Sequence, residues 1–450
     1  MDQNLWELIK RPALDALRKI AQYETVETSG EADRRAMTAP DSSGQTVSFG
    51  GPGRGAEDLD GLQELVEGIH QRPNTAWKFA LPGTDIADRS SLMVHEIAMV
   101  PLVLAQRCAV LGEQSINEET LARLYREHEP YLIDPDPRVD VIVPILGAIF
   151  EEGTKFKEYS VIEMSGSLYD AFSAVPHIKD RDRSSLQRAT HAVKLENVKC
   201  IPGGYGEYFD ICMDEAGEDA LARFFQGMAV ALPGRTTYAQ VGYLARGWSA
   251  FATAGPSAPF THLLRDYALR LDRIDDREPV QVSPAKAEEI SSLAEALLKA
   301  HLSVRVAARR LANSYERDDD EDRIIDLCIA LEALLGSGSG ETVHRLSLRA
   351  AALLTRAGWS DSKEIYSATK DMYSYRSRVV HGTPGPHKKD LLDIGGMPIH
   401  ASRFALAALC TLLRLALQNG GFNPAKLDDD YIFSAFDVAA GGFQQNDQEE

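Results

Sequence analysis

A helical periodicity in the last third of the chain constrains its fold more than any other feature of the sequence. Apolar residues recur there at spacings of three and four, which places them on one face of an α-helix. Short acidic, Gly-Ser or Gly-Pro breaks separate the segments that have this spacing. The segments predict helices over Pro284–Tyr315, Arg323–Leu335, Thr342–Ala357, Ser362–Val380 and Pro398–Asn419. Helices joined by such short loops predict an all-α bundle over residues 284–420.

The part of the chain before this bundle has a mixed character. Residues 1–130 are expected to be mostly helical, with a flexible loop near residues 36–56, which are rich in Thr, Ser, Pro and Gly. Residues 131–280 contain shorter runs of Val and Ile, such as Asp140–Phe150, which predict strands. Helical spacing returns in Thr236–Thr253 and Pro259–Ile274, where we expect helices. The expected fold class is α+β: an N-terminal mixed α/β region, then the all-α bundle.

The charge of the chain limits the partners that it can bind. The formal net charge is −19, whereas affinity for phosphates comes from Lys and Arg side chains. Most of the surface should therefore repel nucleic acid, and any nucleic acid must bind at a local basic site. An acidic tail over residues 421–450 adds to the negative charge, and its end is expected to be disordered.

The distribution of apolar residues and cysteines bears on the compartment. No run of about 18 apolar residues predicts a membrane span, and no uninterrupted apolar core near the N-terminus predicts a signal peptide. The five cysteines are scattered and show no Cys-x-x-Cys spacing, which argues against a disulfide framework and a zinc ribbon. We therefore expect a cytoplasmic protein with no membrane partner.

Positive charge collects inside the bundle, between Glu341 and Asp390. This window contains nine Lys and Arg against five Asp and Glu, so its net charge is 9 − 5 = +4. Arg345 and Arg349 are spaced i, i+4 and share one face of a helix. Together with Arg378 they are candidates for binding phosphates of a nucleic acid. A charged stripe of this kind is often only a solvated helical face, and that alternative stays open.

The helix over Ser362–Val380 ends in a sequence that could carry chemistry, YSYRSRVVHG. Gly382 suits the position after a helix end, and the prolines that follow cannot continue a helix. His381 should therefore be at the end of the helix. Arg376 precedes it by five residues, which would put the two side chains on different faces unless the helix unwinds at His381.

Glu332 is the one charged residue in the apolar segment Leu327–Leu335. A carboxylate that faces a core needs a partner. Arg345, Arg349 and Arg376 are the candidates. Glu332 either forms a structural ion pair that fixes helix packing or orients a catalytic arginine.

These segments together resemble a known family. Arg323–Leu335 (RIIDLCIALEALL), Leu346–Leu354 (LSLRAAALL) and Tyr375–Gly382 (YRSRVVHG) look like an ApeA-type HEPN domain over roughly Pro284–Asn419. HEPN domains carry an Arg, four to six residues, and a His at the end of a core helix. Four residues intervene here, and Ser377 provides the polar residue that usually follows the arginine.

The resemblance implies a metal-independent endoribonuclease. Arg376 and His381 would be catalytic, with Ser377 and Glu332 supporting them. The ribose 2′-hydroxyl would attack the adjacent phosphorus, so neither a metal nor a cofactor is implied. The resemblance also implies RNA as substrate, with tRNA as one candidate, and a homodimer formed through this domain. It points to anti-phage defence by abortive infection, in which the N-terminal part senses a phage-derived trigger or restrains the ribonuclease.

Two other classes of function stay open at this point. The HEPN-like block could be catalytically silent and serve as a dimerisation or RNA-binding platform. A metal-dependent hydrolase has little support, because the sequence contains neither a His-x3-His nor a His-Glu-x-x-His pair.

Overall fold

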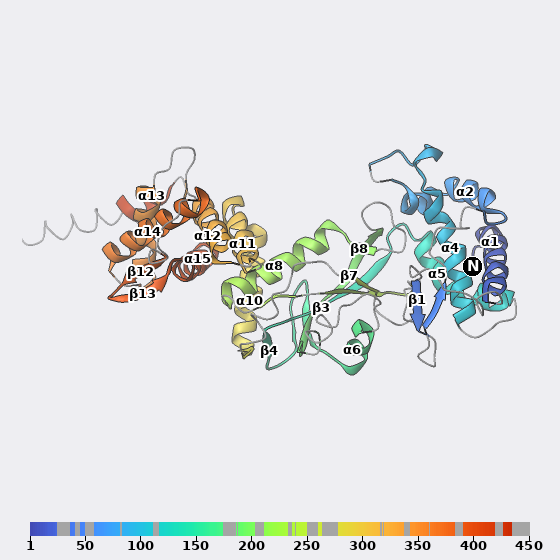
Figure 1. Ribbon diagram of the computed structural model, residues 1–450, viewed down its shortest axis with the longest axis horizontal. Coiled ribbons are helices and arrows are strands. Elements are labelled where there is room, and N and C mark those ends of the chain that lie inside the picture. Colours follow the sequence, from blue (N-terminus) through green and yellow to red (C-terminus); the bar gives the residue numbers. More distant parts are fainter. Residues whose placement is uncertain are drawn as a thin grey trace, which may run out of the picture. The chain divides into compact units, whose positions relative to one another are not determined.

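A computed structural model of the chain forms two compact units, each built from several stretches of sequence (Figure 1). Unit 1 comprises residues 1–144, 157–218 and 239–265, and unit 2 comprises residues 145–156, 219–238 and 266–450. The structure describes residues 1–24, 37–40, 46–49, 58–81, 83–110, 117–173, 186, 188–202, 211–232, 236–238, 240–249, 260–262, 278–315, 317, 319–336, 343–359, 361–382, 390–418 and 426–433. Each unit thus combines stretches of sequence that are separated by stretches of the other unit. The sequence instead predicts four segments that follow one another along the chain.

Unit 1 contains a cluster of helices around a buried apolar core. Helix α1 packs against α4 and α5, and it contributes the buried residues Leu5, Trp6 and Ile9. Asn117 caps α5, since its side chain accepts hydrogen bonds from the first-turn amides. The helices are α1 (Gln3–Glu24), α2 (Leu62–His70), α3 (Pro73–Ala76), η1 (Trp77–Phe79), η2 (Arg89–Ser91), α4 (Val94–Val110), α5 (Glu118–Ile133) and α6 (Gly166–Ser173).

Unit 1 also contains an antiparallel sheet with the strand order β10-β9-β3-β7-β6, in which β8 pairs with β7. Helix α6 covers one face, where Phe172 packs with Ile142 in the core. Gly242 allows this approach, because a Cβ there would lie 2.5 Å from the Phe172 ring. The strands are β3 (Arg138–Pro144), β6 (Ser160–Glu163), β7 (His191–Pro202), β8 (Ile211–Met213), β9 (Val241–Ala245) and β10 (Phe260–His262).

Three predictions for this part of the chain are wrong. The helix expected over Thr236–Thr253 contains strand β9, and the helix expected from Pro259 begins instead with β10. The loop expected near residues 36–56 contains two paired strands, β1 (Met37–Pro40) and β2 (Thr46–Phe49). These short segments become strands because a neighbouring strand pairs with them, and a local spacing rule does not detect such pairing.

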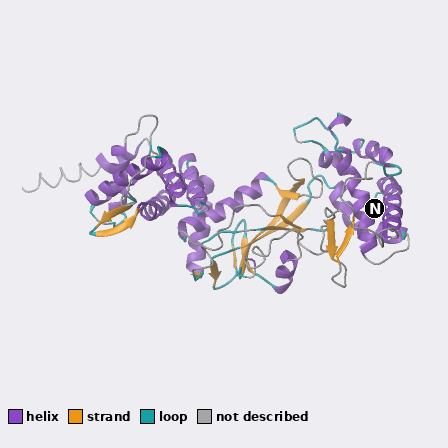
Figure 2. Ribbon diagram, in the orientation of Figure 1, coloured by secondary structure: helices purple, strands orange, loops and turns teal. Residues whose placement is uncertain are grey.

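Unit 2 is dominated by helices, with small pairs of strands (Figure 2). Helix α12 packs against α11, α14 and α15, and α13 packs against α14. The elements are β4 (Ala148–Phe150), β5 (Thr154–Lys155), α8 (Glu215–Ala231, in this unit from Asp219), β11 (Val280–Val282), α10 (Pro284–Lys299), α11 (Leu302–Ser314), α12 (Asp320–Leu335), α13 (Val343–Arg356), α14 (Ser362–Val380), β12 (Leu391–Ile394), β13 (Met397–His400), α15 (Ala401–Gln418) and η5 (Asp428–Phe433).

The predicted helices of this unit are largely present. Arg323–Leu335, Thr342–Ala357 and Ser362–Val380 correspond to α12, α13 and α14. Pro284–Tyr315 is two helices rather than one, because the chain breaks at His301, whose ring caps α11 by accepting from Ser303 N. The helix expected from Pro398 begins at Ala401, after the hairpin β12–β13.

Helix α15 is long and apolar enough to cross a membrane, and it is the one such helix in the parts of the chain that the structure describes. However, 61% of its apolar window is buried inside the protein, as expected for the core helix of a bundle. The chain as a whole mixes helices with small sheets, which agrees with the expected α+β class. The end of the acidic tail, residues 434–450, lies outside the described residues.

Candidate functional site

The end of helix α14 has the geometry that its sequence predicts. The helix begins at the N-cap Asp361, whose side chain accepts from Lys363 N at 2.7 Å. It ends at Val380, and His381 is the C-cap, with its N–H donated to Ser377 O at 3.1 Å. Gly382 follows with φ +59°, the left-handed conformation that glycine adopts most readily. His381 therefore lies exposed at the point where the helix stops.

Arg376 lies one turn earlier on α14 and is only half-buried. Its Nε is buried and makes no hydrogen bond to the described residues, and the same is true of Tyr373 Oη on the same helix. Buried polar atoms without partners are rare in folded proteins, because each costs about 1–3 kcal/mol. Two such atoms three residues apart mark this stretch of α14 as unusual.

Helix α12 brings Glu332 and Cys328 to the same place. Burial raises the pKa of the Cys328 thiol and of the Tyr373 hydroxyl. The negative charge of Glu332 raises these two pKa values further, whereas the positive charge of Arg376 lowers them. Glu332 and Arg376 therefore share one neighbourhood at the α12–α14 contact. We call Cys328, Glu332, Tyr373 and Arg376 the α12–α14 cluster.

Arg376 and His381 are not joined directly. Five residues along a helix rotate a side chain by roughly 140° from its starting direction. Among the described residues, no hydrogen bond links the imidazole of His381 to the guanidinium of Arg376. The structure thus places Arg376 and Glu332 in one neighbourhood, with no ion pair between them among the described residues, and leaves His381 at the exposed end of the helix.

Two of the three arginines expected to pair with Glu332 have another partner. Arg345 and Arg349 both donate to the carboxylate of Asp428, in the short helix η5. Glu332 is half-buried, and it forms no ion pair within the described ranges. Arg376 is the third of these arginines. Its charge and that of Glu332 both affect the pKa values of Cys328 and Tyr373.

The remaining sequence candidates lie on the last turns of α14. The guanidinium of Arg378 lies over the ring of Tyr375, 5.7 Å from its centroid. Ser377 is exposed, and its carbonyl accepts the N–H of His381. The polar groups of this helix end are therefore accessible to a ligand from solvent.

Asp326 is a buried carboxylate of the bundle that was not predicted from the sequence. Its side chain is 3% exposed and pairs with Arg310, at 2.9 Å, and with Arg317. The signal in the sequence was its position among the apolar residues of α12, which is similar to that of Glu332. The pairing with two arginines indicates a structural role, since both charges of such a carboxylate–arginine contact are compensated.

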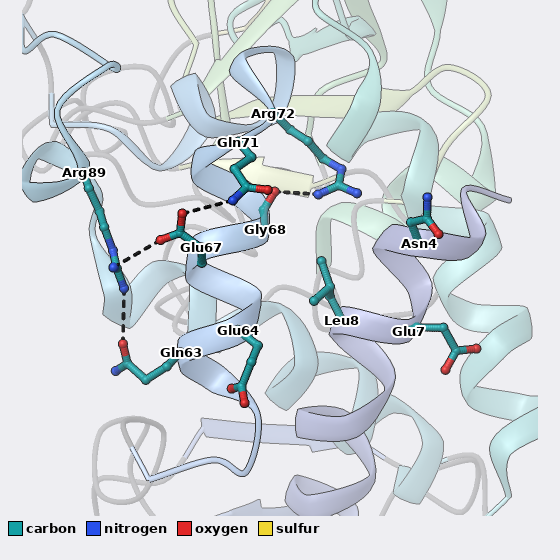
Figure 3. A pocket seen from close by; sticks show the side chains of 10 residues that line it. All are labelled: Asn4, Glu7, Leu8, Gln63, Glu64, Glu67, Gly68, Gln71, Arg72 and Arg89. Atoms are coloured by element: carbon teal, nitrogen blue, oxygen red, sulfur yellow. Dashed lines mark hydrogen bonds and ion pairs between the residues drawn. The ribbon is translucent and has the colours of Figure 1, made fainter.

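Unit 1 contains an open groove of about 790 Å³ between α1 and α2. Some of its polar side chains are engaged with one another (Figure 3). Glu67 pairs with Arg89 at 3.1 Å and accepts from Gln71, and Arg72 donates to Gly68 O at 2.6 Å. These contacts leave the groove without a set of convergent reactive groups.

Neither a metal site nor a similar protein identifies the function of this site. Within the described ranges, no three His, Cys, Asp or Glu side chains gather as a metal site would require. No family model, curated protein or solved structure matches this chain.

Proposed function

We propose that the chain is a metal-independent endoribonuclease of HEPN type, with the α12–α14 cluster and His381 as its site. The proposal comes from the resemblance of the α12, α13 and α14 sequences to an ApeA-type HEPN domain. One structural observation carries it: Arg376 is half-buried, and its Nε has no hydrogen-bond partner. An arginine that forms no ion pair with another described residue can bind the oxyanion of a substrate.

The proposed reaction uses only the substrate's own nucleophile and side chains of this chain. The 2′-hydroxyl of a ribose attacks the adjacent phosphorus and the bond to the 5′-oxygen breaks, which leaves a 2′,3′-cyclic phosphate and a 5′-hydroxyl. Arg376 binds the phosphate and stabilises the charge that develops on its oxygens. His381 transfers a proton, because imidazole does so readily near neutral pH. Ser377, exposed beside them, donates to a phosphate oxygen, and Glu332 orients Arg376.

The biological setting is proposed from the same resemblance. The chain would act in the cytoplasm in anti-phage defence by abortive infection and would cut RNA, with tRNA as the first candidate. A homodimer formed through unit 2 would pair two such sites. The N-terminal part would sense a phage-derived trigger or restrain the ribonuclease.

A second function is favoured by one observation, the lack of a hydrogen bond between His381 and Arg376 within the described residues. A bundle with this geometry could be catalytically silent and act as a dimerisation or RNA-binding platform. In that case Arg376 would bind phosphate without a proton-transfer partner.

The deciding experiment is cleavage of total cellular RNA and defined tRNA in EDTA by the full chain. We expect cyclic phosphate ends from the wild type and a loss of at least about 100-fold in Arg376→Ala and His381→Ala. Arg356→Ala is a matched control, since Arg356 lies on α13 outside the cluster. Cleavage that survives both substitutions would refute the assignment. RNA binding that is lost in Arg376→Ala, with no cleavage by any variant, would favour the platform.

A further inference from the structure

The C-terminal helix η5 places a carboxylate between two arginines of α13. Asp428 Oδ2 accepts from Arg345 Nε at 3.0 Å, Arg345 Nη2 at 2.7 Å and Arg349 Nη2 at 3.0 Å. Its Oδ1 accepts from Arg349 Nε at 2.7 Å. Both guanidiniums thus donate through two nitrogens to one anionic group, which is the arrangement that arginine uses for carboxylates and for phosphates.

At least one of the two arginines is held in a fixed position inside the bundle. Arg349 is 1% exposed, and its Nη1 donates to Leu335 O at the C-terminal end of α12. Arg345 is 47% exposed, so one side of the site opens to solvent. The two guanidiniums lower the pKa of the Asp428 carboxyl, with Arg349 contributing most. The site therefore selects the charged form of an oxyanion.

The site shares helix α12 with the proposed catalytic cluster. Leu335, whose carbonyl fixes Arg349, is one helical turn after Glu332 on α12. Helix α13 also packs against both α12 and α14. An oxyanion bound by Arg345 and Arg349 would thus be held by the same group of three packed helices that carries Arg376.

Asp428, which pairs with the two arginines, belongs to a short helix in the acidic tail. Helix η5 spans only Asp428–Phe433, and Asp429 and Asp430 beside it are exposed. A six-residue helix has little stability of its own, so its position depends on contacts with α13, to which Asp428 contributes two ion pairs. A segment held in this way can leave when a stronger anion competes for the same arginines.

We propose that Arg345 and Arg349 form a phosphate-binding subsite for RNA and that the carboxylate of Asp428 occupies it in cis, in competition with the RNA backbone. This inference rests on the proposed ribonuclease function and adds its regulation. In this structure, the segment 428–433 blocks the subsite. RNA binds fully only when a phosphate displaces Asp428.

The first test measures affinity rather than cleavage. A 12-nucleotide RNA with 2′-O-methyl groups lacks the attacking hydroxyl, so binding by fluorescence anisotropy is independent of catalysis. We expect Asp428→Asn in the full chain to bind it at least tenfold more tightly than the wild type. Asp429→Asn makes the same change in net charge one residue away and should change affinity less than twofold. Equal effects of the two substitutions would overturn the inference.

The salt dependence of binding separates a new phosphate contact from general attraction. Each phosphate contact to a single strand contributes a slope of about −0.7 in the plot of log affinity against log salt concentration. One additional phosphate contact, made by the two arginines together, should therefore make the slope for Asp428→Asn steeper by roughly 0.7. Adding Arg345→Gln to Asp428→Asn should reverse the gain. An unchanged slope would mean that the arginines do not reach the RNA.

A measurement on the unaltered chain keeps the inference testable even if Asp428→Asn unfolds. Hydrogen exchange of the amides of residues 427–432 should become at least tenfold faster when the 2′-O-methyl RNA binds, because the segment is released. Slower or unchanged exchange would overturn the inference.

The two proposals fail in different experiments. If the wild type cleaves RNA in a His381-dependent manner but Asp428→Asn binds no better, the ribonuclease stands and the inference falls. If no variant cleaves but Asp428→Asn gains affinity and exchange accelerates, the subsite stands without the ribonuclease.

Discussion

Arg376 differs from Arg310 and Arg349 of the same unit in the partner of its guanidinium. Arg310 pairs with Asp326 and Arg349 with Asp428, whereas the buried Nε of Arg376 has no hydrogen bond within the part of the chain that the structure describes. A partly buried cation without a counter-ion is unfavourable for folding. The proposed role of Arg376 in binding a phosphate would account for this arrangement, because active sites commonly hold such uncompensated groups.

Replacing Arg376 should therefore separate stability from activity. We expect Arg376→Met to leave the free energy of unfolding unchanged or to raise it by up to about 1 kcal/mol, since an unsatisfied group is removed. Cleavage should be lost in the same protein. Urea unfolding of wild type and variant provides the measurement. A loss of more than about 2 kcal/mol would mean that Arg376 has a structural partner after all.

His128 of unit 1 should make stability depend on pH. It is 1% exposed, its Nδ1–H donates to Ser249 O at 2.7 Å, and burial lowers its pKa to about 4. An unfolded histidine titrates near 6.5, so between pH 4 and 6.5 the unfolded state binds more protons. The resulting stability is fully present above pH 6.5 and is lost as pH falls toward 4, by about 3 kcal/mol in total.

The matched variant is His128→Asn, whose amide N–H can replace Nδ1–H but does not titrate. Urea unfolding at pH 7, 5.5 and 4.5 should show a smaller decline for the variant than for the wild type. Parallel declines would show that other groups cause the acid sensitivity.

At the scale of elements, the packing of α11 against α12 depends on a charge rather than on apolar residues alone. Asp326 sits on the buried face of α12 and accepts from Arg310 of α11 and from Arg317, which follows that helix. Removing one partner from a buried ion pair leaves the others uncompensated. The contact between these helices is therefore sensitive to a single substitution.

Asp326→Asn should destabilise unit 2 by about 3–5 kcal/mol. Glu321→Gln is the control, because Glu321 is exposed in the first turn of the same helix and should cost less than about 0.5 kcal/mol. Denaturant unfolding followed by circular dichroism compares them. Equal, small effects would show that the two arginines can be solvated without cost.

At the scale of the whole molecule, two compact units with separate cores should unfold as separate transitions. Unit 1 buries Phe79 completely, and unit 2 buries Asp326. In calorimetry we expect Phe79→Leu to lower the midpoint of one transition and Asp326→Asn that of the other. If both substitutions shift one common transition, the units unfold together.

The sequence by itself determined the helices of unit 2 and the end of α14 at His381. These features follow from local rules: apolar spacing, a capping Asp361, and a glycine at a left-handed position. The same rules failed at β9 and β10, where pairing between strands decided the structure. The same rules placed Arg376 and Glu332 on their helices, but they did not predict which side chains contact them.

Only the tertiary structure decided which charges meet. It placed Asp428 on Arg345 and Arg349, about 80 residues away in sequence. It also made Asp326 the paired carboxylate of α12, and it left Arg376 with an orphaned Nε. Ion pairs between distant segments depend on how the helices pack and on which charged side chains this packing brings together, and neither is encoded in the spacing of residues along one helix.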